Sequence, residues 1–282
     1  MVRIGGKTRV LITLQILVLC GGLASREGHC AVSAISLESG LSNLSTFLTG
    51  DIASAEVKTI GLTFDHRAYE PATPLGNRIG FDLGLEATVV QVPPLLTDAL
   101  AVGGFSVPLT FLPSVKVLNF HKGITDMFDV GGSIFTFRGY LIWAVDLKMI
   151  LLHPEEGATW AIRLSRNSTH LPVGTTTLFM SELSLDIDTV TWTPQLIVSK
   201  KMSFADPYLG IGYQYATGGM YLTTLSGPTI PGLESITSAG GSFMGFLGLS
   251  LAPPSGGLRL TLELAYSAIG FNSMGTKFGF TF

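Results

Sequence analysis

The sequence predicts an all-β protein that folds as one closed antiparallel β-barrel and spans a membrane. Three observations predict this fold. From about residue 59 onward, apolar and polar residues alternate with the period of two that is typical of β-strands. Only 13% of the 282 residues are charged, whereas the surface of a soluble domain carries about 25–35%. Beyond residue 25, no uninterrupted apolar run reaches the ~20 residues of a membrane-spanning helix, so strands have to make the crossing.

The composition also excludes several classes of protein. The formal charge of -3 provides no basic field for a phosphate backbone, so nucleic acid is not an expected partner. The two cysteines, Cys20 and Cys30, both precede the predicted strands. The bulk of the chain therefore has neither a disulfide framework nor a thiolate metal site.

Residues 1–34 are predicted to be a signal peptide with its processing region. Basic residues between positions 3 and 9 precede the apolar run 10–19, and small residues follow it. The run is too short to span a bilayer. Cleavage after Ala24 or after Ala34 fits the small-residue rule, and both sites stay open. The sequence therefore predicts an exported protein.

Residues 35–57 are predicted to form a short amphipathic helix on the periplasmic side or in the lumen. Four leucines between Leu37 and Leu48 recur at helical spacing, Ser36 is a suitable N-cap, and Gly50 ends the pattern. The pattern does not decide whether this helix enters the barrel or stays outside it.

Residues 58–282 are predicted to form the transmembrane barrel. The clearest strand is 78–88, where Ile79, Phe81 and Leu83 alternate with polar or small residues. We predict about twelve strands, with ten to fourteen left open, and single-chain bacterial barrels have an even number. The segment 218–240 is predicted to be a long external loop. The predicted strand segments are 59–66, 78–92, 107–119, 128–137, 140–152, 159–166, 176–187, 190–199, 208–216, 243–252, 258–270 and 274–282.

The polar faces of these strands are rich in Gly, Ser and Thr and carry isolated charges that would fill a narrow lumen. Opposite charges recur two to four positions apart on one strand, as in Arg78 with Asp82, Asp146 with Lys148, and Arg259 with Glu263. Such charges either pair across strands and fill a narrow interior or select solutes by charge at a constriction. Pairing is favoured, because a barrel of about twelve strands is much narrower than an open porin. The predicted lumen residues are Arg78, Asp82, Glu86, Lys116, Asp146, Lys148, Arg163, Asp186, Arg259 and Glu263.

The sequence predicts no catalytic, cofactor or metal site. His66, His121, His153 and His170 fall at predicted turns, without metal-ligand spacing or a nucleophile-elbow setting. Asp65 and His66 resemble the Asp-His pair of outer-membrane aspartyl-type proteases, with Asp186 and Asp188 as possible acidic partners. The surrounding residues and their order differ from that family. The chain is therefore expected not to be an enzyme.

The last strand carries a family resemblance. Phe278, Phe280 and the terminal Phe282 alternate with polar or small residues. This segment resembles the terminal strand of bacterial outer-membrane β-barrel proteins. The resemblance implies that the three phenylalanines form an assembly signal read by the barrel-assembly machinery. It also implies insertion into outer-membrane lipid, with both termini in the periplasm.

These features predict a narrow channel or a transporter for small or apolar solutes. The apolar composition and the N-terminal helix are loosely similar to long-chain fatty-acid transporters, although no specific motif of theirs is present. Two alternatives stay open. One is a closed structural or surface-interaction barrel without transport, and the other is a soluble secreted β-sandwich.

Overall fold

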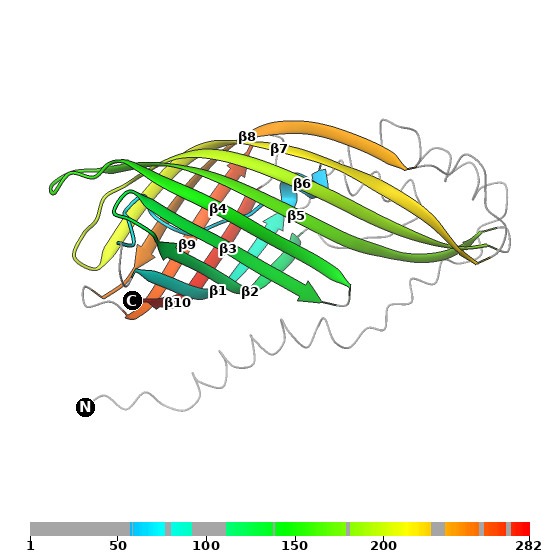
Figure 1. The fold of residues 1–282 in the computed structure, drawn as a ribbon, viewed down its shortest axis with the longest axis horizontal. Coiled ribbons are helices and arrows are strands. Elements are labelled where there is room, and N and C mark those ends of the chain that lie inside the picture. Colours follow the sequence, from blue (N-terminus) through cyan, green and yellow to red (C-terminus); the bar gives the residue numbers. More distant parts are fainter. Residues whose placement is uncertain are drawn as a thin grey trace, which may run out of the picture. The chain divides into compact units, whose positions relative to one another are not determined.

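The computed structural model describes residues 57, 59–76, 80–91, 111–137, 139–178, 181–226, 235–253, 257–268 and 272–282. In these residues, antiparallel strands follow one another around a ring, and the last strand pairs with the first, as Figure 1 shows. Leu83 lies opposite Phe280 on one side and Phe120 on the other, which closes the barrel. The strands are β1 (Phe81–Gln91), β2 (Phe111–Gly123), β3 (Phe128–Phe137), β4 (Tyr140–Leu152), β5 (Thr159–Leu178), β6 (Ser181–Ser199), β7 (Ala205–Ser226), β8 (Ile236–Leu251), β9 (Gly257–Ser267) and β10 (Asn272–Thr281).

The closed antiparallel barrel confirms the predicted fold class, but the count of twelve strands is wrong. The described residues form ten strands. Segment 59–66 is not a strand, because the amide of Phe64 donates to the carbonyl of Ile60 at 3.0 Å in a helical turn. Segments 176–187 and 190–199 are not separate strands either, since β6 runs through both and the first residues of 176–187 belong to β5. Strands β3 and β4 have the predicted bounds.

Two further predicted segments differ or lie elsewhere. Most of the predicted loop 218–240 is strand, because β7 continues to Ser226 and β8 begins at Ile236. The predicted helix around Leu37–Leu48 lies outside the described residues, as does the signal region. Among the described residues, no helix has the length and apolar character needed to cross a bilayer.

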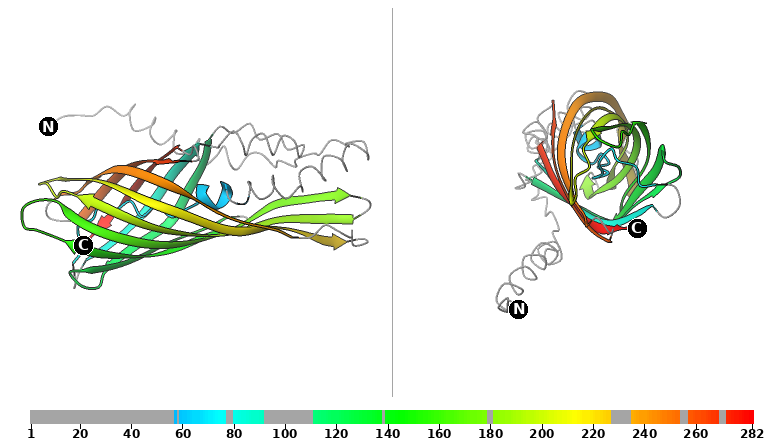
Figure 2. Two further views of the ribbon diagram at one scale, coloured as in Figure 1. Left: turned by 90° about the horizontal axis from the view of Figure 1, so that it is seen from above. Right: turned by 90° about the vertical axis from the view of Figure 1, so that its left-hand side faces the viewer.

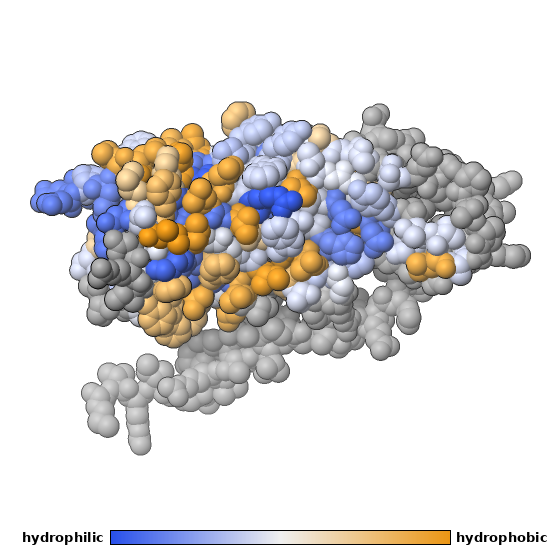
Figure 3. Space-filling view, in the orientation of Figure 1, coloured by the Kyte–Doolittle hydropathy of each residue, from blue (hydrophilic) through white to orange (hydrophobic). Residues whose placement is uncertain are grey.

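Apolar side chains cover the outside of the barrel. Along β9, Leu262, Leu264 and Tyr266 point outward and are 41–58% exposed, while Thr261 and Glu263 point inward and are buried. Figure 3 shows the apolar groups gathered over the end of the barrel that holds the C-terminus, with hydrophilic groups toward the other end. A soluble protein rarely exposes a continuous apolar surface of this kind. We call this surface the apolar belt.

The height of the apolar belt suits a membrane. From Leu258 to Tyr266 the chain advances about 27 Å at the usual rise per strand residue. A tilt of about 40° reduces this to about 20 Å, close to the ~25 Å apolar band of transmembrane barrels.

On β5, Arg166 lies at the border of the apolar belt that is farther from the C-terminus. Arg166 lies over the ring of Trp143 at 4.9 Å and over that of Trp192 at 5.8 Å. Aromatic rings beside a cation are typical of a membrane–water boundary. Tyr208, in contrast, is buried inside the barrel and is not part of an interfacial girdle.

Four neighbouring strands continue beyond this border. Strands β5 to β8 have 16–22 residues, whereas the other six have 10–13. The left panel of Figure 2 shows their far parts leaving the ring as an extension. We call this extension, residues 171–178, 181–188, 217–226 and 236–240, the crown.

Residues 57 and 59–76 lie inside the barrel, and we call them the inner segment. The right panel of Figure 2 shows it in the lumen. Val57 and Ile60 pack against Leu171, Ile187 and Met220 near the crown. At the other end, the amide of Leu75 donates to Asp129 at 3.3 Å. The inner segment therefore passes along the lumen, from the crown end to the end that holds Phe282.

Candidate functional site

The part of the inner segment nearer the crown is hydrogen-bonded to three different strands. The Thr191 hydroxyl donates to the carbonyl of Gly61 at 2.8 Å, and the Asn167 amide donates to that of Phe64 at 2.9 Å. Gln214 donates to the Asp65 carboxylate at 2.7 Å, and Thr193 donates to the same oxygen at 2.8 Å. The barrel wall thus satisfies backbone and side-chain groups of a segment that has no water around it.

Two histidines and one aspartate meet in the middle of the lumen. Nε2 of His66 lies 3.0 Å from Oδ2 of Asp146, and Nε2 of His121 lies 3.1 Å from the same oxygen. His66 comes from the inner segment, His121 from β2 and Asp146 from β4. All three side chains are buried, at no more than 1% exposure.

Lys148 anchors the part of the inner segment farther from the crown. Its Nζ lies 3.3 Å from Oε2 of Glu70 and 2.9 Å from Oδ2 of Asp129. It also donates to the carbonyls of Pro71 and Thr73, at 3.2 and 3.1 Å. Two buried carboxylates therefore hold one buried ammonium group.

A second ion cluster lies beside the first. Asp82 pairs with Lys277 at 2.8 Å and with Arg259 at 2.9 Å. Nζ of Lys277 in turn lies 3.4 Å from Nδ1 of His121. The two clusters therefore form one connected network across strands β1, β2, β3, β4, β9 and β10.

The predicted lumen residues occupy different places in the structure. The side chains of Asp82, Glu86, Asp146, Lys148, Arg163 and Glu263 are buried on the inner face, and Arg259 reaches inward to Asp82. Arg78 lies outside the described residues, and Lys116 stands opposite Glu86 in the register of β1 and β2.

Asp186 corrects the prediction, because it lies on the outer face of β6. Its neighbour Ile187 points into the inner cluster. This position belongs to the crown, and its carboxylate accepts a hydrogen bond from the Ser184 hydroxyl at 3.3 Å. Because both faces of the crown tolerate polar residues, the sequence does not indicate that Asp186 points outward.

The charge pairs join different strands or the inner segment. Asp82 pairs with residues of β9 and β10, Asp146 contacts the two histidines, and Glu263 accepts a hydrogen bond from Tyr208 at 2.8 Å. Lys148 and Arg259 likewise have their partners on elements other than their own strands.

Sequence reasoning missed the two histidines as site residues. His66 and His121 were expected at turns, yet His121 lies within β2 and His66 within the lumen. They stand 55 positions apart in the chain, and only barrel closure with the inner segment in place brings them together. No local spacing could have signalled this contact.

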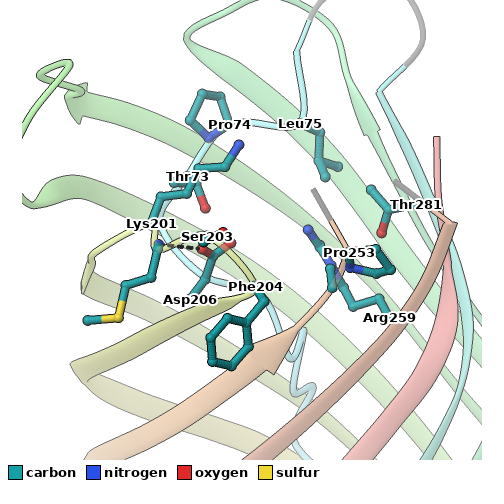
Figure 4. Close-up of a pocket in the computed structure, with 12 residues that line it drawn as sticks. Thr73, Pro74, Leu75, Lys201, Ser203, Phe204, Asp206, Pro253, Arg259 and Thr281 are labelled. Atoms are coloured by element: carbon teal, nitrogen blue, oxygen red, sulfur yellow. Dashed lines mark hydrogen bonds between the residues drawn. The ribbon is translucent and has the colours of Figure 1, made fainter. Parts of the chain in front are cut away.

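A small cavity lies where the inner segment ends. It measures about 150 Å³ and is lined by Thr73, Leu75, Asp206, Arg259 and Thr281, as Figure 4 shows. This recess holds a few waters or a small ion, and the inner segment forms one of its walls.

The comparisons with known proteins give similar solved structures and no family. No protein-family model matches the chain, and no curated protein matches it. Similar solved structures include Ail of Yersinia pestis in complex with the heparin analogue sucrose octasulfate, with a TM-score of 0.34, 10% identity, and coverage of 72% of this chain and 95% of Ail. The outer membrane protease OmpT of Escherichia coli has a TM-score of 0.34 and 10% identity, covering 72% of this chain and 94% of OmpT. The translocator domain of the autotransporter NalP of Neisseria meningitidis has a TM-score of 0.39 and 8% identity, covering 88% of this chain and 99% of the domain.

These three neighbours are outer-membrane β-barrel proteins, and the family of this chain stays unassigned. The expectation that the chain is not an enzyme is corrected, because one neighbour, OmpT, is an outer membrane protease and a fold does not by itself exclude catalysis.

Proposed function

We propose that this protein is an outer-membrane barrel whose lumen is closed by its own inner segment and whose crown is a surface for interaction outside the membrane. The observation that carries the proposal is the bonding of residues 59–76 to the barrel wall. The apolar belt, the predicted signal peptide and the terminal phenylalanines support insertion into the outer membrane.

A closed lumen follows from the energetics of the anchors. Removing one partner of a buried ion pair costs about 3–5 kcal/mol. Withdrawing the inner segment would separate Glu70 from Lys148 and His66 from Asp146, and it would also expose the apolar cluster of Val57 and Ile60. These costs together disfavour spontaneous opening, so solutes have no path past the inner segment.

The crown is the part of the barrel that suits contact with a partner. Its outer face is polar, since Asp188 lies 2.6 Å from His170 and both side chains are about half exposed, at 51% and 44%. Tyr221 and Leu225 add exposed ring and aliphatic surface. A mixed polar and aromatic surface of this kind is typical of a protein or glycan partner. Transport through a displaced inner segment is the competing function.

Planar-bilayer recording distinguishes these functions. We expect the folded chain to give no stable conductance steps in a membrane where a general porin gives clear ones. A disulfide between the inner segment and β7 would fix the segment in place. It can be introduced with Gly61→Cys and Ala216→Cys in a Cys20→Ser, Cys30→Ser background. A Cβ on Gly61 would lie 2.8 Å from that of Ala216, so a small adjustment allows a disulfide.

The same disulfide also tests for transport through a displaced inner segment. We expect oxidation to cross-link the two cysteines and to leave the silent recording unchanged. Conductance steps in the unmodified chain that disappear on oxidation of the double-cysteine chain and return on reduction would show that the inner segment moves. That result would reject the closed barrel in favour of transport.

A further inference from the structure

The contact between His66, His121 and Asp146 has the geometry of a metal site. The three ligand atoms, two Nε2 and one carboxylate oxygen, all lie within 4.8 Å of one another. Each nitrogen is 3.0–3.1 Å from the oxygen. A tetrahedral zinc ion with ligand distances of 2.0–2.1 Å separates its ligands by about 3.3 Å. The three atoms therefore need only small movements to coordinate one ion.

Each imidazole also has an acceptor behind it. Oγ of Ser133 lies 3.1 Å from Nδ1 of His66, and Oε1 of Glu70 lies 3.2 Å from Nδ1 of His121. Histidines that bind metals donate their other ring N–H to a hydroxyl, carbonyl or carboxylate oxygen, which fixes the tautomer with a free Nε2. His66 has the outer contact that this tautomer requires, and at His121 the Glu70 carboxylate lies close enough to accept from Nδ1 although Nζ of Lys277 lies 3.4 Å from the same nitrogen.

Within the described part of the chain, one oxygen of the Asp146 carboxylate has no hydrogen-bond partner, and a glycine lies beside the site. Oδ1 of Asp146 is buried and has no hydrogen-bond partner among the described residues. This oxygen, like those of Glu70 and Asp129 beside it, can accept from a further group or contact an ion. On β3, a Cβ added to Gly131 would overlap the His121 ring and lie 2.6 Å from Oδ2 of Asp146. Glycine is therefore the residue that leaves this position clear.

The surrounding charges favour an additional cation. The directly connected network contains more carboxylates than permanent cations, and the excess is one negative charge. One proton on histidine, or a divalent ion that carries a bound hydroxide, would balance it. The groups are four carboxylates, Glu70, Asp82, Asp129 and Asp146, and three cations, Lys148, Arg259 and Lys277.

We propose that His66, His121 and Asp146 bind one late first-row divalent cation of the Zn²⁺ class. Two imidazole nitrogens and one carboxylate oxygen suit Zn²⁺ and leave a fourth position for water. Because His66 belongs to the inner segment and the other ligands to the barrel wall, the ion clamps the segment in place. The site stands whether or not the lumen conducts, so conductance does not test it.

Complete burial has a kinetic consequence. An ion can reach the three ligands only before the inner segment is seated, because the folded barrel covers them. We expect Zn²⁺ to be taken up during folding and to be released very slowly to an external chelator afterwards. Uptake also displaces the protons between the histidines and Asp146, so folding with metal releases protons.

The test uses the full chain without an affinity tag and with Cys20→Ser, Cys30→Ser and His29→Asn, so that only the described histidines remain. The chain is unfolded with chelator and refolded into detergent with a small excess of Zn²⁺. After a chelator wash, we expect elemental analysis to find one zinc per folded barrel. Asp146→Asn and His66→Gln should each lower the retained zinc at least tenfold, and His170→Gln is the matched control that should retain it.

Heat-dependent gel migration separates loss of zinc from loss of folding in each variant. Refolding with Co²⁺ gives a second readout in the unmodified site, since a four-coordinate ion with nitrogen ligands has strong visible absorption bands. Folded barrels that retain no zinc and show no such bands would overturn the proposal. Equal zinc in the His66→Gln and His170→Gln chains would overturn it as well.

Discussion

Replacing Lys148 by methionine is expected to lower the free energy of unfolding by about 3–5 kcal/mol. The methionine side chain fills a similar volume but has no charge. Glu70 and Asp129 then stay buried without their ammonium partner, and the carbonyls of Pro71 and Thr73 lose a donor. Urea-dependent unfolding in lipid vesicles, followed by gel migration, measures the change.

A matched control and a double variant test the reason for this loss. Lys200 is exposed at the end of β6, so Lys200→Met should change the stability by less than about 0.5 kcal/mol. Adding Glu70→Gln to Lys148→Met should cost less than the sum of the two single changes, because one of the unpaired charges is removed. A loss for Lys148→Met no larger than that for Lys200→Met would contradict the buried network.

Arginine on the apolar belt is expected to cost about 2–4 kcal/mol near the middle of the membrane. Leu262 points outward from β9, midway between Leu258 and Tyr266, and is 41% exposed. In lipid, Leu262→Arg places a charge in hydrocarbon, so fewer molecules should fold and the folded ones should unfold at lower urea. The fraction of the faster-migrating folded band after refolding into vesicles gives the first quantity.

The crown offers the matched control for this substitution. Leu225 is also an outward leucine, 55% exposed, but it lies about 33 Å along β7 beyond Tyr215, outside the belt. Leu225→Arg should therefore fold as the unmodified chain does. Equal effects of the two arginines would mean that the belt does not face lipid.

The barrel could be predicted from the sequence because its wall obeys a local rule. Strands inside the belt need apolar residues on one side only, so period-two alternation fixes both their bounds and their facing, as for β3 and β4. In the crown that rule no longer holds. The outward position of Asp186 and the length of β6 could not be predicted, because both faces there tolerate polar residues.

The conformation of the inner segment could not be predicted from alternation. Residues 59–64 alternate Thr, Ile, Gly, Leu, Thr and Phe, which imitates a strand. The segment lies in a lumen where polar and apolar side chains both find partners, Ile60 in an apolar cluster and Thr63 on the carbonyl of Thr59 at 2.7 Å. Alternation therefore carries no information about its conformation.

The candidate site depends on contacts between distant parts of the chain. Asp82 and Arg259 meet because β1 and β9 both flank β10, and His66 reaches Asp146 because the inner segment returns through the ring. The sequence favours pairing of the lumen charges between strands, but it does not tell which strands meet. The charged residues could therefore be predicted, whereas the two histidines and the individual partners could not.

Quenching of tryptophan fluorescence tests most directly whether the outer face of the barrel lies in lipid. The chain has three tryptophans, Trp143, Trp160 and Trp192, and all three lie on the outer face. Refolded into vesicles whose acyl chains carry bromine, the unmodified chain should lose most of its fluorescence, while iodide in the water should quench little. Strong quenching by iodide together with unchanged fluorescence in brominated lipid would contradict the account, because the belt would then face water.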